Sequence, residues 1–407
     1  MLKSIAKVSQ VVLTACAVAT AAPAAQAADT IKIGLSVSST GSFALASQSG
    51  ERGIDIWADE VNARGGIPIG GKKRKVELIK LDDRSDKQQV AKVYESLIQD
   101  RGADVVIAPF GSTLTGVAAT VTERLDRFMV IWSAAADAIY KQGFTRLISA
   151  SQMPVSVMPK AEIDAAKTLG VKKMAIIYVD APFPAGLAVA AESLAKQNGI
   201  EIVMMEKYAN GTKDFSTMLE KAKALGADGF YPSAYENDQI AMVRQMKELD
   251  ITFPFSFIVY ASQPQFLQIG HDADFLFSHT NFHEAVNWKV NAGLDRTQFL
   301  AAYARLFPKV NYAPDFQTAL AYGAAVVMEK IIEKAGTTDA AKLKAASLDL
   351  SKKLTVLSGP YEIDAAGTQL GMPFVVVQNQ KDGVKAVYPE AVANAKAVYP
   401  IPPWSKR

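Results

Sequence analysis

Short apolar runs alternate with longer amphipathic runs along most of the chain. Residues 31–37 form a β-branched run that predicts a strand, and 51–63 predict a helix because their apolar positions share one face. The first half continues with strands at 76–82, 104–110 and 128–133 and helices at 87–99 and 114–127. Strands that are apolar on both faces and alternate with helices indicate a parallel sheet covered on both sides.

The alternation restarts after residue 150. It predicts helices at 155–169, 185–197, 215–225, 239–249, 294–306 and 316–335, and strands at 174–179, 200–205, 230–232, 255–260, 361–364 and 374–378. A helix-to-strand junction, Gly102-Ala103-Asp104, is echoed by Gly226-Ala227-Asp228 in the second half. No flexible linker separates the halves, so we expect two α/β lobes joined by short crossings.

These patterns give a division of the chain. We assign 1–27 to a leader, 28–150 plus 281–357 to lobe 1, and 151–280 plus 358–407 to lobe 2, with crossings near Ala150, Thr280 and Ser358.

The N-terminus predicts export. Lys3 and Lys7 precede an apolar stretch at 11–22, and Ala25-Gln26-Ala27 has the form of a signal peptidase site, so we expect cleavage after Ala27 and a periplasmic protein. A competing interpretation is lipid anchoring at Cys16. The apolar run before Cys16 is short, which favours the cleaved, unanchored form.

Composition excludes several function classes. Cys16 is the one cysteine, so a chain cleaved after Ala27 has no disulfide, cysteine nucleophile or thiolate metal site. The formal net charge is +3, without a basic stripe, which disfavours nucleic acid as a partner. No hydrolase, nucleotide or metalloprotease motif occurs, so we expect neither catalysis nor a cofactor. His279, His283 and Glu284 would suit a metal only on a helix, and we expect a solvated loop there, with His283 as a candidate cleft residue.

Small, polar loops follow three strands of the first half, at 38–43, 111–116 and 133–137. Ligands of parallel sheets bind at the carboxyl ends of strands, where helix N-termini and Ser or Thr hydroxyls can hold a carboxylate. Each loop alone could be an ordinary helix cap. The candidate residues in these loops are Phe43, Ser112, Thr113, Ala134 and Ala136.

The second half places larger residues at its strand ends: Phe183, Tyr235 and Tyr260. A polar anchor on one lobe and an aromatic wall on the other would suit a small organic acid. The alternative is that these aromatic side chains pack between the lobes or in the core.

From about residue 31 to 388 the sequence resembles the periplasmic branched-chain amino-acid (leucine/isoleucine/valine) binding proteins. The matching stretches are Thr40-Gly41, residues 61–67, Leu81-Asp82-Asp83 and Lys213-Asp214-Phe215-Ser216. The resemblance implies two Rossmann-like lobes, type I periplasmic-binding fold, joined by a three-crossing hinge that closes on ligand. It also implies a solute-binding component that serves an ABC-transporter permease, for which we expect a monomer.

The resemblance carries individual residues over. Ser112, with Thr113 beside it, stands where the family binds the substrate carboxylate, whereas the following loop, Ala134-Ala135-Ala136, lacks the family's usual threonine. Tyr235 matches one second-lobe tyrosine, and Phe183 replaces another.

The main departure concerns the substrate's ammonium group. Amino-acid binders have a glutamate where this chain has Val259-Tyr260, and a buried ammonium without a counter-charge is unfavourable by several kcal/mol. We therefore expect an aromatic or aliphatic acid without a free amino group. An amino-acid or amide receptor, in which Glu236 or Asp238 replaces the missing anchor, remains the alternative. A secreted hydrolase and a cytoplasmic ligand-responsive regulator are less consistent with the sequence.

Overall fold

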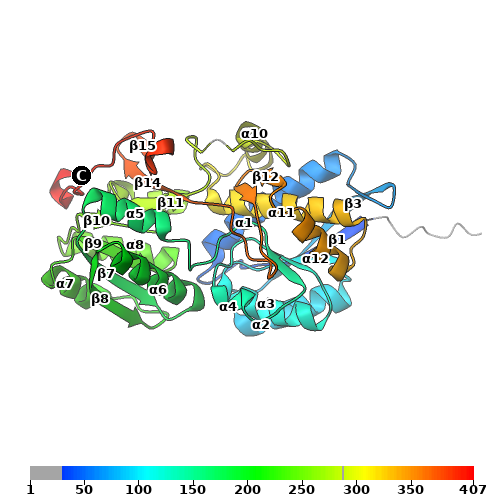
Figure 1. The fold of residues 1–407 in the computed structure, drawn as a ribbon, viewed down its shortest axis with the longest axis horizontal. Coiled ribbons are helices and arrows are strands. Elements are labelled where there is room, and N and C mark those ends of the chain that lie inside the picture. Colours follow the sequence, from blue (N-terminus) through cyan, green and yellow to red (C-terminus); the bar gives the residue numbers. More distant parts are fainter. Residues whose placement is uncertain (1–29, 287) are drawn as a thin grey trace, which may run out of the picture.

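The computed structural model describes residues 30–286 and 288–407, which form two α/β lobes side by side (Figure 1). The expected signal peptide and Cys16 lie outside the described residues. None of the described helices has the length and apolarity required to span a membrane.

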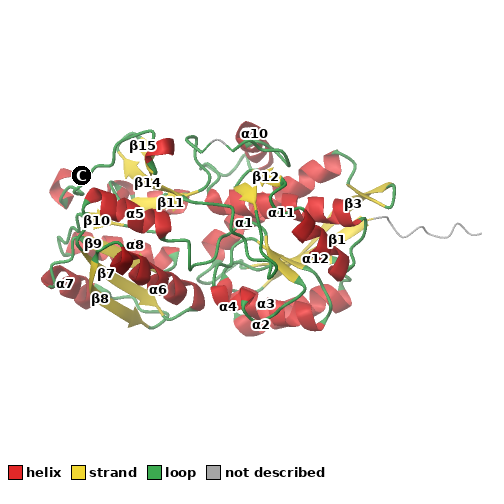
Figure 2. Cartoon of the chain, in the orientation of Figure 1, coloured by secondary structure: helices red, strands yellow, loops and turns green. Residues whose placement is uncertain are grey.

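Lobe 1 is built on a six-stranded sheet in the order β2-β3-β1-β4-β5-β6. Its strands are β1 (Thr30–Val37), β2 (Ile67–Ile69), β3 (Lys72–Asp82), β4 (Val105–Ile107), β5 (Met129–Ile131) and β6 (Leu147–Ser149). Its helices are α1 (Ala44–Ala63), α2 (Lys87–Glu95) with a π-helical turn at Ser96–Asp100, α3 (Ser112–Arg124), α4 (Asp137–Tyr140), α10 (Arg296–Leu306), α11 (Phe316–Ala335) and α12 (Ala340–Asp349). All pairings are parallel except that between β2 and β3, which agrees with the predicted helix-covered parallel sheet (Figure 2).

Lobe 2 has a four-stranded sheet in the order β10-β9-β7-β8 and an adjoining three-stranded sheet, β11-β14-β15. The strands are β7 (Lys173–Val179), β8 (Glu201–Tyr208), β9 (Gly229–Ser233), β10 (Phe255–Ser256), β11 (Phe277–Thr280), β14 (Val375–Gln380) and β15 (Gly383–Tyr388). The helices are α5 (Lys160–Leu169), α6 (Pro182–Gln197), α7 (Ser216–Ala224), α8 (Glu236–Glu248) and α9 (Pro264–Leu267), with short 3-10 turns at Gly270–Ala273, Glu390–Val392 and Trp404–Lys406. A bridge between Phe257 and Phe277 joins the two sheets.

Three segments connect the lobes, after β6, after β11 and before β14. Beyond the hairpin of β12 (Leu354–Val356) and β13 (Gly359–Tyr361), the chain still hydrogen-bonds to lobe 1, because the Gln369 amide donates to Ala150 O at 3.2 Å. We therefore propose that the third crossing lies between Gln369 and Val375 rather than near Ser358. Within this stretch, Phe374 stacks on His279 of β11, with ring centroids 4.0 Å apart.

Two local predictions were wrong for physical reasons. The first long helix begins at Ala44 rather than at residue 51, because small residues between these positions allow close packing. A Cβ on Gly50, for example, would lie 2.2 Å from the Trp132 ring. His279, expected in a solvated loop, is fully buried in β11. Its Nδ1 donates to the buried carboxylate of Glu162, which also accepts a hydrogen bond from the Tyr231 hydroxyl.

The close approach of α1 and α11 gives a prediction about stability. A Cβ on Gly53 of α1 would lie 2.2 Å from the backbone oxygen of Thr318, so Gly53→Ala is expected to lower the free energy of unfolding by about 1–3 kcal/mol. Gly116 of α3 is the matched control, because a Cβ there meets no atom of the described residues within 4 Å. Gly116→Ala is expected to raise the free energy of unfolding, measured by urea denaturation, by up to about 1 kcal/mol. Equal changes in the two variants would contradict the packing argument.

Candidate functional site

A small cavity of about 10 Å³, roughly the space of one water molecule, lies between the lobes. It is lined by Phe110, Gly111, Ser133, Gln152, Phe183, Tyr235, Tyr260 and Gln317. Lobe 1 contributes the loop ends after β4 and β5 and the start of α11, and lobe 2 contributes residues at the starts of α6 and α8. Among these described lining residues, none has a charged side chain.

Helix N-termini surround this cavity. Gly111 is the N-cap of α3, Tyr235 is the N-cap of α8, and Phe183 lies in the first turn of α6. None of these three helices has a side-chain cap within the described chain, whereas Asp315 caps α11 by accepting from Thr318 N. Uncapped N-termini leave backbone N–H groups and a partial positive charge beside the cavity. In α6 the first turn contributes fewer N–H groups, because Pro182 and Pro184 have none.

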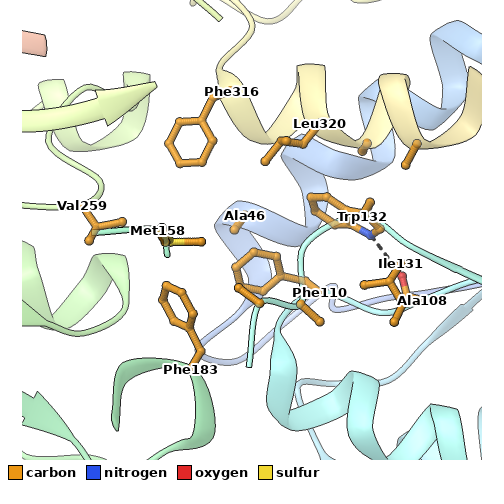
Figure 3. Close-up of a cluster of buried hydrophobic side chains, with 14 of the residues drawn as sticks. Ala46, Ala108, Phe110, Ile131, Trp132, Met158, Phe183, Val259, Phe316 and Leu320 are labelled. Carbon is orange, nitrogen blue, oxygen red and sulfur yellow. Dashed lines mark hydrogen bonds between the residues drawn. The ribbon is translucent and has the colours of Figure 1, made fainter. Parts of the chain in front are cut away.

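Aromatic rings form the walls of the cleft. Phe43 of lobe 1 contacts Tyr235 of lobe 2 with ring centroids 4.9 Å apart, and Phe183 lies 6.1 Å from the same tyrosine. Figure 3 shows Phe110 and Trp132 on the lobe 1 side and Phe183 on the lobe 2 side of this buried cluster. The Trp132 indole is fixed by donation to Ala108 O at 3.0 Å, so the apolar wall on lobe 1 is rigidly oriented.

Two of the predicted carboxylate-binding loops line the cavity through Gly111 and Ser133, whereas the named candidates Ser112, Thr113, Ala134 and Ala136 lie beside it. The Ser112 hydroxyl accepts hydrogen bonds from Ala135 N and Ala136 N, at 3.1 and 3.0 Å, and so ties α3 to the loop after β5. Ala134 is fully buried, and its carbonyl accepts from the Tyr140 hydroxyl. The role of Ser112 as a direct ligand contact therefore remains a prediction, as does that of Ala134 and Ala136.

Thr113 and Tyr235 approach each other across the lobe boundary. Neither hydroxyl has a hydrogen-bond partner among residues 30–286 and 288–407. Burial raises the pKa of the Tyr235 hydroxyl, and the nearby Thr113 hydroxyl opposes this shift.

His283 does not join the other predicted site residues. Its Nε2 donates to Val384 O at 2.9 Å and its Nδ1 accepts from Ala285 N, so both ring nitrogens have local backbone partners near β15. No group of three or more His, Cys, Asp or Glu in the described part of the chain is arranged to hold a metal ion.

The two acids proposed as alternative ammonium anchors have different surroundings. Asp238 accepts a hydrogen bond from the Tyr208 hydroxyl at 3.0 Å. Glu236 is 7% exposed, and its Oε1 has no partner within the described residues. Burial raises the pKa of Glu236 to about 8, the negative charge of Asp315 adds to the rise, and the Phe266 N–H opposes it. Burial chiefly raises the pKa of the Tyr260 hydroxyl, and Tyr235 and then Glu236 add to the rise, so Glu236 lies near the cavity lining.

Gln152 and Gln317 were missed by the sequence reasoning. Gln152 follows the first crossing and Gln317 lies in the first turn of α11, and neither position belongs to a recognisable motif. The one available signal was the position of Gln317 in the first turn of the helix predicted at 316–335.

Known proteins resemble this chain over most of its length. A family profile described as periplasmic binding protein matches residues 30–384. Leu/Ile/Val-binding protein homolog 7 from Brucella suis is 27% identical over 393 residues, which cover 91% of this chain and 94% of that protein.

Solved structures share the fold. A leucine binding protein LivK from Thermotoga maritima has a TM-score of 0.76 at 23% identity, covering 88% of this chain and 98% of its own. A solute binding protein from R. palustris in complex with benzoate has a TM-score of 0.73 at 18% identity, covering 89% and 98%. These findings confirm the expected two-lobed α/β fold and the family resemblance. The chain therefore belongs to the periplasmic binding protein family, and it is an extracytoplasmic solute-binding protein rather than an enzyme.

Proposed function

We propose that this protein captures a small carboxylate-bearing organic molecule, an aromatic or aliphatic acid, between its lobes and delivers it to an ABC-transporter permease. The observation that carries the proposal is the set of uncapped N-termini of α3, α6 and α8 around a cavity lined by aromatic and neutral polar side chains. Such N-termini favour an anion without any cationic side chain. The aromatic walls would contact the apolar body of the acid.

The same surroundings disfavour a free ammonium group. The chain has Val259-Tyr260 at the position of the family's glutamate, and the described lining contains no acid. A protonated Glu236 carries no counter-charge, and its raised pKa makes the protonated form predominant near neutral pH.

A branched-chain amino-acid receptor is the second candidate, and the unpaired, buried Oε1 of Glu236 favours it. In that case the ligand's ammonium would stabilise the ionised carboxylate, so leucine binding would release a proton. Calorimetry in buffers of different ionisation enthalpy measures this release.

We further propose a cleaved signal peptide at residues 1–27, a periplasmic, monomeric mature protein, and the three-crossing division of the lobes given above. A monomer would be able to present both lobes to one permease. These proposals follow from the N-terminal sequence and the family relationship.

Thermal unfolding of ligand-stripped protein tests the ligand class. Leucine and 4-methylpentanoate form a matched pair that differs in the amino group, and benzoate represents aromatic acids. A ligand at about 100 times its Kd adds roughly 2.7 kcal/mol, which shifts the midpoint by several degrees. A shift with either acid and none with leucine supports the proposal, whereas a shift with leucine alone contradicts it.

A further inference from the structure

Three polar side chains at the cavity have unsatisfied atoms. The Oε1 atoms of Gln152 and Gln317 and the Tyr235 hydroxyl have no hydrogen-bond partner among the described residues. Gln152 is 6% exposed and Gln317 is 3% exposed, and all three residues line the same cavity. A buried polar group without a partner costs about 1–3 kcal/mol. Because they come from three separate segments, their convergence calls for a ligand group that all three can reach.

Three of the four buried glutamines elsewhere in the described chain use both ends of their amides, and the fourth, Gln263, also has an Oε1 without a partner. Gln239 donates to Pro232 O and accepts from Tyr260 N, and Gln369 donates to Ala150 O and accepts from Gly371 N. Gln378 likewise donates to Phe275 O and accepts from Val398 N. Gln152 and Gln317 have no such structural bonds in the described chain, so their amides are available to a ligand.

The Ser112 hydroxyl is differently placed. It already accepts two backbone N–H groups, and it does not line the cavity. The lining also holds the hydroxyls of Tyr260 and of Ser133, which accepts from Gly111 N at 3.1 Å. Among the described lining residues, the buried side-chain atoms without any partner are those of the two glutamines and Tyr235.

We infer that Gln152 and Gln317, together with the Tyr235 hydroxyl, hold the carboxylate head group of the ligand and are its specificity-determining residues. A carboxylate is acceptor-only, and a glutamine amide supplies two N–H donors once its orientation places nitrogen toward the ligand. The phenol O–H supplies a second kind of donor, and all of these donors are neutral. The positive ends of α3, α6 and α8 then supply the potential that favours an acid over a cationic amine. This inference rests on the proposed function.

Calorimetry of glutamine variants tests the inference, with benzoate and 4-methylpentanoate as probes. Gln152→Met and Gln317→Met keep an unbranched side chain and remove the donors, so each is expected to weaken acid binding by roughly tenfold or more, the value of a hydrogen bond to a charged group. Gln317→Glu places a carboxylate opposite that of the probe. It is expected to weaken benzoate binding further and to leave the binding of benzamide, its neutral isostere, unchanged. Exposed Gln268 on the surface of lobe 2 is the control, and Gln268→Met is expected to stay within about threefold of wild type.

The outcomes separate the inference from the proposed function. If wild-type protein binds an acid and both methionine variants bind it equally well, the inference is overturned and the proposed function stands. If wild-type protein binds leucine but neither acid, the proposed function itself fails and the inference fails with it. Thermal midpoints confirm that each variant folds, and Tyr235→Phe, which removes one oxygen, repeats the test with minimal disturbance of packing.

Discussion

Replacing Glu162 by alanine is expected to lower the free energy of unfolding by about 3–5 kcal/mol. Glu162 of α5 is fully buried and accepts hydrogen bonds from Tyr231 of β9 and His279 of β11. The substitution leaves a phenol and an imidazole buried without an acceptor, at about 1–3 kcal/mol each, and adds a cavity. The network joins a helix to two strands, so its loss destabilises lobe 2 as a whole.

Urea unfolding followed by circular dichroism measures this effect. Glu220→Ala is the matched control, because Glu220 is exposed on α7 of the same lobe, and its change is expected within about 0.5 kcal/mol. A loss below about 1 kcal/mol in Glu162→Ala would mean that the buried network contributes little to stability.

Stability is also expected to fall as the pH rises from about 4.5 to about 8, because of Glu236. Burial first, and then repulsion by Asp315, raises its pKa in the folded protein from 4.5 to about 8. The folded state therefore binds the proton more tightly than the unfolded state. The contribution of this carboxyl to stability is complete below pH 4.5 and is lost as the pH approaches 8, by up to about 1.4 kcal/mol per pH unit.

Glu236→Gln removes the titrating group with little change of shape. The free energy of unfolding of the variant is expected to match that of wild type near pH 4.5 and to exceed it by roughly 4 kcal/mol at pH 8. Unfolding curves at both pH values, with Glu248→Gln at an exposed position of the same helix as the control, measure the difference. Similar effects of Glu236→Gln at the two pH values would contradict a raised pKa.

Much of the fold could be predicted because periodicity reports burial directly. The strand at Thr30–Val37 and the helix at Phe316–Ala335 lie where the apolar pattern placed them. The pattern failed where close packing requires small residues. The first turns of α1 contain small and polar residues typical of a loop, yet Ala46, Ser47 and Ser49 are buried and Gly50 packs against Trp132.

The site was less accessible to sequence reasoning. Phe183, Tyr235 and Tyr260 were predicted as strand-end aromatics and do line the cavity. Gln152 and Gln317 were not found, since their distinguishing feature is the lack of a partner, which depends on the three-dimensional surroundings of each amide. For the same reason the sequence did not show that the Ser112 hydroxyl is occupied by two backbone N–H groups.

The stack of His279 on Phe374 has a mechanical consequence. His279 stands at the second crossing and Phe374 in the third, so two of the three segments that connect the lobes are in contact with each other. Sliding the second crossing along the third must separate the rings of His279 and Phe374, whose centroids lie 4.0 Å apart. A rotation about an axis that passes through both rings leaves the stack intact. We therefore propose that the stacked pair limits twisting of one lobe against the other during ligand capture and so keeps Gln152 and Gln317 at the same cavity.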